Sequence, residues 1–491
     1  MVLFALSIGI ALGNATPETP CLSLMHRMAQ GPIPVQDVSS DSAQSRVMEK
    51  QARMPLGGLP QSLKTTNFLI QWGVFDGFST SDIEQLATAL ETSWAIQVDE
   101  KQYPVPRGAN TYLINVYIGN THESAPKIYS NARAYVDTDD EGYARIVISP
   151  SLLRNAAALK TTAAHEFFHT IQWHANADYI YAPGSPANWY WEATAVWMEQ
   201  EVYPESTEHH RHLPNFLFFP ELPLSHFPTE WTGTLSDSHA YGAFLFPLYL
   251  QQILPSAPLI RESFTNTQGQ SDPLQVLDRL LNTYDTTLKE TFFGFSAANG
   301  TLAYPQREAF LEALDEYGGY NSAYSNRPSG TLSYHNAEWK SDATHFPASL
   351  GVNYWNVVPS TDPYSIHIDS FEDGDWFAAL VSFDGSTHTS QTIEWQGQDS
   401  VRVEIDTPLS ESWLVVSVID SSSDTRIHPY RVSFQTKPKR QDTGDTGSPP
   451  QTERGCATKG SVNLPIVGLI GLLVLLRRRR QDPLHFAHQT R

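Results

Sequence analysis

Two histidines and a glutamate stand at a spacing that suits metal-dependent hydrolysis. The chain contains the run His165-Glu166-Phe167-Phe168-His169, an HExxH sequence. On a helix, residues four apart lie on one face, so both imidazoles can reach a single ion. Glu166 is turned by about 100° from His165 and can reach a water on that ion. We therefore predict that the two histidines bind zinc and that Glu166 acts as the general base.

A catalytic zinc site needs a third protein ligand. Glu192 follows His169 by 23 residues and lies in the otherwise apolar and aromatic segment 189–197. A carboxylate buried there is costly unless it is paired or bound to a metal. A third histidine at HExxHxxGxxH spacing is excluded, because Gln172 and Ala175 occupy the required positions. We predict Glu192 as the third ligand of one catalytic Zn²⁺. The alternatives are a solvated or salt-bridged Glu192 and two metal-free core histidines.

An HExxH helix followed by a glutamate on the next helix resembles the gluzincins. The order of elements over residues 65–435 also resembles the secreted metalloproteases of myxobacteria. These resemblances imply a zincin fold and hydrolysis of peptide bonds in a protein or peptide substrate. The chain departs from the thermolysin-like pattern, which has Asn before the third ligand and Asp after it, because Trp191 and Val196 stand at those positions.

A donor for the developing oxyanion is expected near the start of a further helix. His239 and Tyr241 both carry an N–H or O–H group in the segment 238–244. Tyr241 followed by Gly242 resembles a feature of the same protease family. Both residues are therefore candidate catalytic residues, and the alternative is that each is an ordinary packed or surface side chain.

Three other polar features receive a non-catalytic interpretation. Glu199 lies seven residues after Glu192, and we favour an exposed position over a role in orienting a ligand. The run 209–212 contains three histidines, for which a solvated loop is favoured over a second metal site. Ca²⁺ is possible at Asp137, Asp139, Asp140 and Glu141, but without EF-hand spacing a solvated hairpin turn is favoured.

The elements that must position these residues follow from the hydrophobic pattern. Strands are expected at 68–72, 112–118, 132–136 and 143–149, and helices at 159–174, 188–203 and across much of 239–315. Ser81 and Glu84 predict a capping box at the start of an earlier helix. From 326 to 434 short β-type segments alternate with turn residues.

The fold class is therefore predicted as α+β. A zincin-like catalytic domain at 65–325 would contain a twisted mixed sheet, the active-site helix and a mostly helical second lobe. An all-β sandwich at 326–436 would follow it. The remaining segments are a signal peptide at 1–15, a leader or propeptide at 16–64, a polar linker at 437–461, an apolar helix with an arginine cluster at 462–480, and a tail at 481–491.

Composition and the chain ends bear on compartment and partners. The formal net charge of -21 argues against nucleic acid as a partner. Cys21 and Cys456 are the two cysteines, so disulfides are not the basis of stability. The order of polar stalk, Cys456, short apolar run and arginines resembles the C-terminal sorting signals of myxobacterial surface proteins, and a plain tail anchor is the alternative. We predict export, with attachment to the membrane or cell surface, or secretion after processing.

The prediction that follows is an exported zinc-dependent endopeptidase. The rival from another class is a non-catalytic surface adhesion or recognition protein on a degenerate zincin scaffold. The presence of Glu166 favours the enzyme, because a binding module has no use for a general base.

Overall fold

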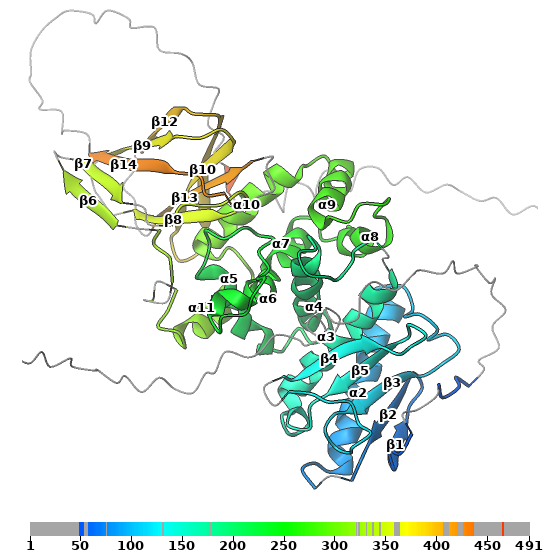
Figure 1. Ribbon diagram of the computed structural model, residues 1–491. Coiled ribbons are helices and arrows are strands. Elements are labelled where there is room, and N and C mark those ends of the chain that lie inside the picture. Colours follow the sequence, from blue (N-terminus) through cyan, green and yellow to red (C-terminus); the bar gives the residue numbers. More distant parts are fainter. Residues whose placement is uncertain are drawn as a thin grey trace, which may run out of the picture. The chain divides into compact units, whose positions relative to one another are not determined.

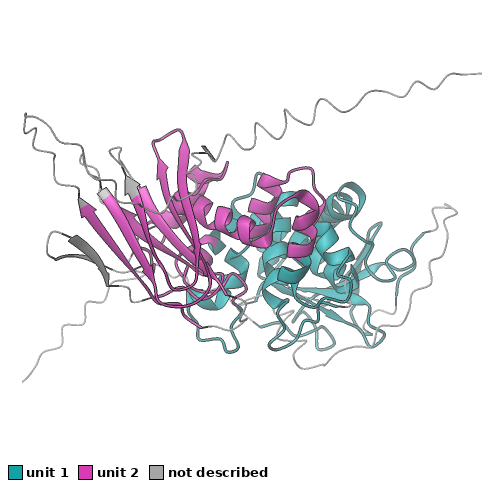
Figure 2. Ribbon diagram, turned by 90° about the horizontal axis from the view of Figure 1, so that it is seen from above, with its two compact units in different colours: residues 1–212, 227–244, 260–276 teal, residues 213–226, 245–259, 277–491 magenta. Residues whose placement is uncertain are grey.

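A computed structural model shows an α+β protein (Figure 1). It describes residues 49–53, 57–74, 76–129, 132–175, 178–320, 322, 325–329, 331–335, 338–342, 345–357, 364–405, 412–420, 426–436 and 464–465. The chain divides into two compact units (Figure 2). Unit 1 comprises the chain up to 212 together with 227–244 and 260–276, and unit 2 comprises 213–226, 245–259 and the chain from 277.

Unit 1 is built on a five-stranded mixed sheet with the order β1-β2-β3-β5-β4. Its central pairs, β2 with β3 and β3 with β5, are parallel, and the outer pairs are antiparallel. The bounds are β1 Gln61–Lys64, β2 Phe68–Trp72, β3 Ile114–Ile118, β4 Ala134–Thr138 and β5 Ala144–Ile148. The central strands are apolar and almost continuously buried, as strands covered on both faces should be.

Helix α2 of unit 1, Thr80–Trp94, begins at a polar cap. It starts with a capping box between Ser79 and Asp82, so the predicted box at Ser81 and Glu84 is wrong by two residues. The true box satisfies the first free amides of the helix in the same way. Further elements of unit 1 are η1 Ala95–Glu100, η2 Leu152–Arg154, α3 Ala156–Ala175, α4 Asn188–Val202, η3 Glu208–His212, η4 Leu235–Ser238 and α6 His239–Gly242.

Unit 2 contains helices and two five-stranded sheets. The sheets have the orders β15-β11-β10-β13-β8 and β12-β9-β14-β7-β6. Its helical elements are α5 Leu213–Leu217, α7 Leu245–Ile253, η5 Asn282–Tyr284, α10 Leu288–Thr301 and α11 Arg307–Asp315, while α8 Leu259–Thr265 and α9 Pro273–Leu281 cross the unit boundaries. The strands are β6 Thr331–His335, β7 Glu338–Asp342, β8 Val352–Val357, β9 Tyr364–Ser370, β10 Asp375–Phe383, β11 His388–Gln396, β12 Ser400–Ile405, β13 Ser412–Ile419, β14 Tyr430–Thr436 and β15 Leu464–Pro465.

Residues from both sheets of unit 2 form one hydrophobic core. Trp355 on β8 and Trp376 on β10 are fully buried with Val432 on β14. The Trp355 indole donates to the Tyr430 hydroxyl over 2.6 Å, which satisfies its polar group inside the core. Helix α10 packs on β10 and β13 of the first sheet. The expected β-rich character of this part of the chain is therefore present.

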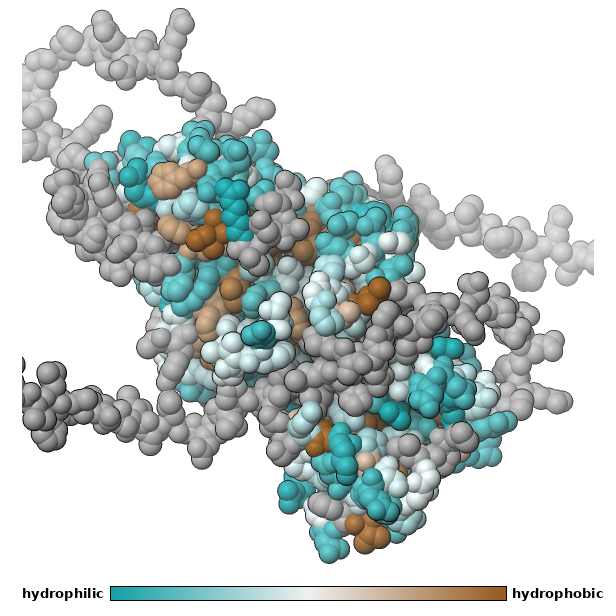
Figure 3. All heavy atoms as spheres, viewed as in Figure 1, coloured by the Kyte–Doolittle hydropathy of each residue, from teal (hydrophilic) through white to brown (hydrophobic). Residues whose placement is uncertain are grey.

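The predicted signal peptide at 1–15 and the linker at 437–461 lie outside the described residues. Of the apolar run at 462–480, only Leu464–Pro465 is described, as the short strand β15. Among the described residues, no helix is both long and apolar enough to cross a membrane. Hydrophilic residues cover much of the described surface on the face shown in Figure 3, which agrees with the high formal charge.

Candidate metal centre

Three side chains of unit 1 converge in the way that a zinc ion requires. Nε2 of His165 lies 3.1 Å from Nε2 of His169. Oε2 of Glu192 lies 3.3 Å from the first of these nitrogens and 3.6 Å from the second. Ligands that lie about 2.0–2.2 Å from one ion at tetrahedral angles are separated by about 3.3–3.6 Å. The nitrogen and oxygen donors therefore fit a zinc ion in both type and spacing.

Helix α3 holds the two histidines because its other faces are apolar and buried. Asn155 caps the helix, since its side-chain oxygen accepts from the amide of Ala158 over 3.2 Å. Phe167 packs edge-on against Phe68 of β2, with ring centroids 5.5 Å apart. The helix also contacts α2, β4 and β5. These contacts fix the rotation of α3 and place both imidazoles on one side.

Helix α4 brings the carboxylate of Glu192 to α3. The small residues Ala193 and Ala195 are fully buried, and the two helices pack against each other. Glu192 is itself fully buried. The hydroxyl of Tyr181 donates to Oε1 of Glu192, so Oε2 is the oxygen turned toward the two histidines. The predicted orientation of Glu192 toward the histidines is present in the structure.

A second layer of hydrogen bonds fixes the imidazole rings. Nδ1 of His165 donates to Oε1 of Glu199 over 2.9 Å, and Nδ1 of His169 donates to Oε1 of Gln172 over 2.6 Å. Such bonds set the tautomer, so that Nε2 of each ring is left to bind a metal. Our preference for an exposed Glu199 is wrong, because its side chain is only 1% exposed.

Burial and neighbouring carboxylates determine the charge state of the centre. Burial alone would lower the pKa of His165, but the hydrogen bonds that its ring donates to Glu192 and Glu199 outweigh burial and raise this pKa to about 10. Burial opposes ionisation of Glu192, yet the charges and hydrogen bonds of the two histidines lower its pKa. Without a metal, the centre therefore holds a proton between the imidazoles and carboxylates, and a divalent cation would replace that positive charge.

The remaining predicted catalytic residues differ in their relation to this centre. Glu166 is buried beside the first histidine and adds to the negative potential at that ring. The Tyr241 ring is stacked on the His165 ring, with centroids 6.2 Å apart and an interplanar angle of 9°. His239 is fully buried on the same short helix, α6. The structure thus brings Tyr241 to the candidate centre, against the ring of His165.

The histidine-rich run is buried, which contradicts the expected solvated loop. His209, His210 and His212 are at most 8% exposed. Burial lowers the pKa of His209 to about 3 and that of His210 to about 4, so both rings are neutral near pH 7. The His212 ring stacks on the Tyr241 ring, with centroids 5.2 Å apart. Tyr241 in turn stacks on His165. This run therefore packs beside the metal centre.

No second candidate metal site accompanies the first within the described part of the chain. There, the grouping of His165, His169 and Glu192 is the one set of three or more metal-binding side chains whose ligand atoms converge. In the acidic turn, Asp137 pairs with Arg145 and Asp139 pairs with Arg53. Because arginines neutralise these carboxylates, the turn gives no support to a calcium site.

Sequence reasoning missed the residues that hold the ligands in place. Tyr181 and Gln172 belong to no recognisable motif. The amide nitrogen of Gln172 donates to the carbonyl of Trp191 over 3.0 Å and to the hydroxyl of Thr194 over 2.8 Å. An amide in a helix that is otherwise buried was the available signal, because buried polar groups need partners.

Comparison with known proteins identifies a family but no activity. A family model described as "Family of unknown function (DUF6055)" matches residues 58–418. No curated protein matches the chain. One matching solved structure is "A novel family GH115 4-O-Methyl-alpha-glucuronidase, BtGH115A, with specificity for decorated arabinogalactans", at 9% identity and a TM-score of 0.15. That match covers 58% of this chain and 39% of the other, and its low TM-score carries no argument. The family match covers most of the chain, which therefore belongs to the DUF6055 family.

Proposed function

We propose that this protein is a zinc-dependent endopeptidase. The observation that supports the proposal is the convergence of Nε2 of His165, Nε2 of His169 and Oε2 of Glu192 within 3.6 Å of one another. Zinc bound there would supply a Lewis acid and a water whose pKa is lowered toward about 7. Two imidazoles and one carboxylate leave a position for that water, as catalytic zinc sites do.

The other steps belong to the protein's own side chains. Glu166 accepts the proton of the attacking water and then delivers it to the leaving amine. Glu199 and Gln172 bond to Nδ1 of the two imidazoles, which leaves Nε2 of each to hold an ion. Tyr241, stacked beside His165, is the better placed of the two predicted oxyanion donors.

The finer parts of the fold and location belong to the same proposal. We propose that unit 1 is the zincin-like catalytic part and that the two sheets of unit 2 form the expected sandwich. The mixed sheet followed by α3 and α4 supports the first, and the shared core of the two sheets supports the second. Export and surface attachment rest on the sequence of the chain ends alone.

The proposal is tested with the full chain, a chelator and one variant. Purified protein should contain zinc in equimolar amount and should cleave casein. Hydrolysis should be lost with 1,10-phenanthroline and recovered when zinc is added back. Glu166→Gln should keep the zinc and reduce kcat by about 10²-fold or more, because the general base is removed. An exposed substitution on the same unit, Glu205→Gln, serves as the matched control.

The rival proposal is a non-catalytic recognition protein on the same scaffold. Equimolar zinc with no hydrolysis of casein or of a mixed peptide library would favour that rival. Absence of zinc binding in the intact protein, with the three ligands present, would overturn both.

A further inference from the structure

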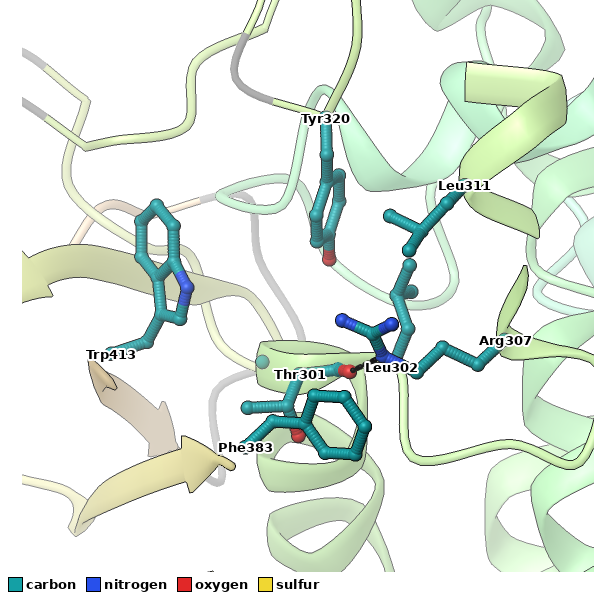
Figure 4. A pocket seen from close by; sticks show the side chains of 8 residues that line it. Thr301, Leu302, Arg307, Leu311, Tyr320, Phe383 and Trp413 are labelled. Atoms are coloured by element: carbon teal, nitrogen blue, oxygen red, sulfur yellow. Dashed lines mark hydrogen bonds between the residues drawn. The ribbon is translucent and has the colours of Figure 1, made fainter. Parts of the chain in front are cut away.

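We propose that a pocket in unit 2 binds a carboxylate that carries an apolar side chain, the chemistry of the C-terminal residue of a peptide. The pocket has a volume of about 180 Å³ and is lined by Gly300, Thr301, Leu302, Arg307, Leu311, Tyr320, Phe383 and Trp413 (Figure 4). It shares no residue with the metal centre. Its volume is below that of pockets that take drug-sized ligands, so the pocket suits a small ligand and not a long one.

Arg307 supplies a cation whose orientation is already fixed. Its Nε donates to the carbonyl of Thr301 over 3.1 Å, and its guanidinium lies 4.1 Å from the centre of the Phe383 ring. Figure 4 shows this side chain reaching from α11 toward Thr301 at the pocket. A guanidinium held on an aromatic face and pinned at one nitrogen keeps its other donors for a carboxylate.

The present partner of Arg307 is easily replaced. Nη1 of Arg307 pairs with Oε1 of Glu308 at 2.9 Å, but the Glu308 side chain is 85% exposed. An ion pair with so exposed a carboxylate is weak, because solvent screens it. A carboxylate that enters the pocket can take the place of Glu308 and is desolvated by the aromatic walls.

The other walls favour an apolar body over a sugar. Leu302 and Trp413 are buried in the lining, and further apolar surface comes from Leu311 and Phe383. The polar groups of the lining are largely committed elsewhere. The Tyr320 hydroxyl donates to the carbonyl of Asn299 over 2.6 Å, and the Thr301 hydroxyl pairs with Nδ1 of His388 at 2.8 Å. Sugar hydroxyls would lose water there without enough new partners.

A buried arginine holds the aromatic walls in place. Arg327 is fully buried, and its guanidinium lies 3.9 Å from the Tyr320 ring and 3.8 Å from the Trp413 ring. It donates to the carbonyls of Asn299 and Gly300. A wall that is rigid before binding lowers the entropy cost of binding a small ligand. The charge of Arg327 also adds to the positive potential at the pocket.

Isothermal titration of the full chain tests the proposal with three probes. N-acetyl-L-leucine should bind saturably, and N-acetyl-L-leucinamide at least about tenfold more weakly, because it lacks the charge. D-glucuronate, an acidic sugar, should also bind more weakly than N-acetyl-L-leucine. Arg307→Gln should lower the affinity for N-acetyl-L-leucine by about tenfold or more. Glu308→Gln should bind it more tightly, because the competing carboxylate is gone and the exposed position leaves folding unaffected.

Several outcomes would overturn the proposal. Equal affinity for the acid and the amide, or no saturable binding of either, excludes a carboxylate site. Unchanged affinity in a folded Arg307→Gln protein, or weaker binding in Glu308→Gln, excludes Arg307 as the anchor. Tighter binding of glucuronate rejects the apolar occupant. The titrations are repeated in Glu166→Gln, so the result does not depend on whether the chain hydrolyses peptides.

Discussion

Glu199 accepts a hydrogen bond from Nδ1 of His165 over 2.9 Å, with both side chains buried. The carboxylate comes from α4, the same helix that carries Glu192, so one helix provides both a proposed ligand and the group that orients another ligand. Glu199 follows Glu192 by seven residues, about two helical turns, so both side chains lie on the same face of α4.

Replacing Glu199 should weaken metal binding without removing a ligand. In Glu199→Gln the amide no longer increases the basicity of His165, and zinc affinity should fall by about 10–100-fold. Competition with a fluorescent zinc chelator measures the change. The exposed Glu205→Gln should leave the affinity unaltered, and an unaltered affinity in Glu199→Gln would mean that the hydrogen bond has no influence on the centre.

Gln172 should contribute to both the stability of the fold and the affinity for zinc. Gln172→Leu leaves Nδ1 of His169 without its acceptor and removes one hydrogen bond to the carbonyl of Trp191, which should cost about 1–3 kcal/mol of unfolding free energy. Urea unfolding with and without zinc gives both quantities. As a control, Ser93→Ala removes a buried hydroxyl that bonds to the carbonyl of Ala89 in α2, and it should lower stability but leave zinc affinity unchanged. Equal zinc affinity in both variants would contradict the role given to Gln172.

Zinc affinity should rise with pH. In the metal-free protein Glu192 and Glu199 raise the pKa of His165 to about 10, so a proton competes with zinc below that pH. Because binding releases this proton, the apparent affinity should increase by about tenfold per pH unit between roughly pH 7 and 9.

The raised pKa of His165 also predicts how the stability of the metal-free protein changes with pH. The pKa of a histidine in the unfolded chain is about 6.5, and folding raises that of His165. The protonated ring therefore stabilises the metal-free fold fully below about pH 6.5, and this stabilisation is lost as the pH rises toward 10. Thermal unfolding of the metal-free protein should therefore occur at lower temperature as the pH is raised over this range. In Glu199→Gln the decline should begin near the same pH but be smaller and end at lower pH, because the folded pKa of His165 is raised less. An identical pH profile in both proteins would refute the assignment.

Tyr241 should act in catalysis and leave metal binding intact. Tyr241→Phe keeps the ring stacked on His165 and removes only the hydroxyl. If that hydroxyl donates to the oxyanion, kcat should fall by about 10–10³-fold while zinc affinity stays within about twofold. Tyr103→Phe is the control, because its ring packs edge-on to Phe168 of α3, 5.1 Å away. A normal kcat in Tyr241→Phe would exclude this hydroxyl as the donor.

The sequence identified the proposed ligands because their chemistry is conspicuous against its surroundings. His165 and His169 follow helical spacing. Glu192 is a carboxylate among tryptophans, and burying it there without a partner is physically implausible. The elements around these residues were also predictable, since β2 is a short, mostly apolar run and α4 is apolar and aromatic along most of its length. Most of the expected strands lie within two residues of their predicted bounds.

Two kinds of prediction were wrong. The capping box was placed at Ser81 because Ser79 and Asp82 form an equally acceptable pair two residues earlier, and local pattern does not distinguish the two pairs. The other errors depend on contacts between distant parts of the chain. The burial of Glu199 and of the run 209–212 depends on how α4 and α6 pack with η3, which periodicity does not reveal. Tyr181 is 11 residues from its partner Glu192 and belongs to a segment without regular structure.

The bond from Tyr181 to Oε1 of Glu192 bears on which cations the centre accepts. With that oxygen engaged, the donor set offered to an ion consists of two imidazole nitrogens and one oxygen. Calcium and magnesium favour cages of six or more oxygens, whereas borderline-soft ions accept nitrogen. In the proposed zinc site, a tyrosine hydroxyl outside the ligand set would thus disfavour hard cations, even where they are far more abundant than zinc.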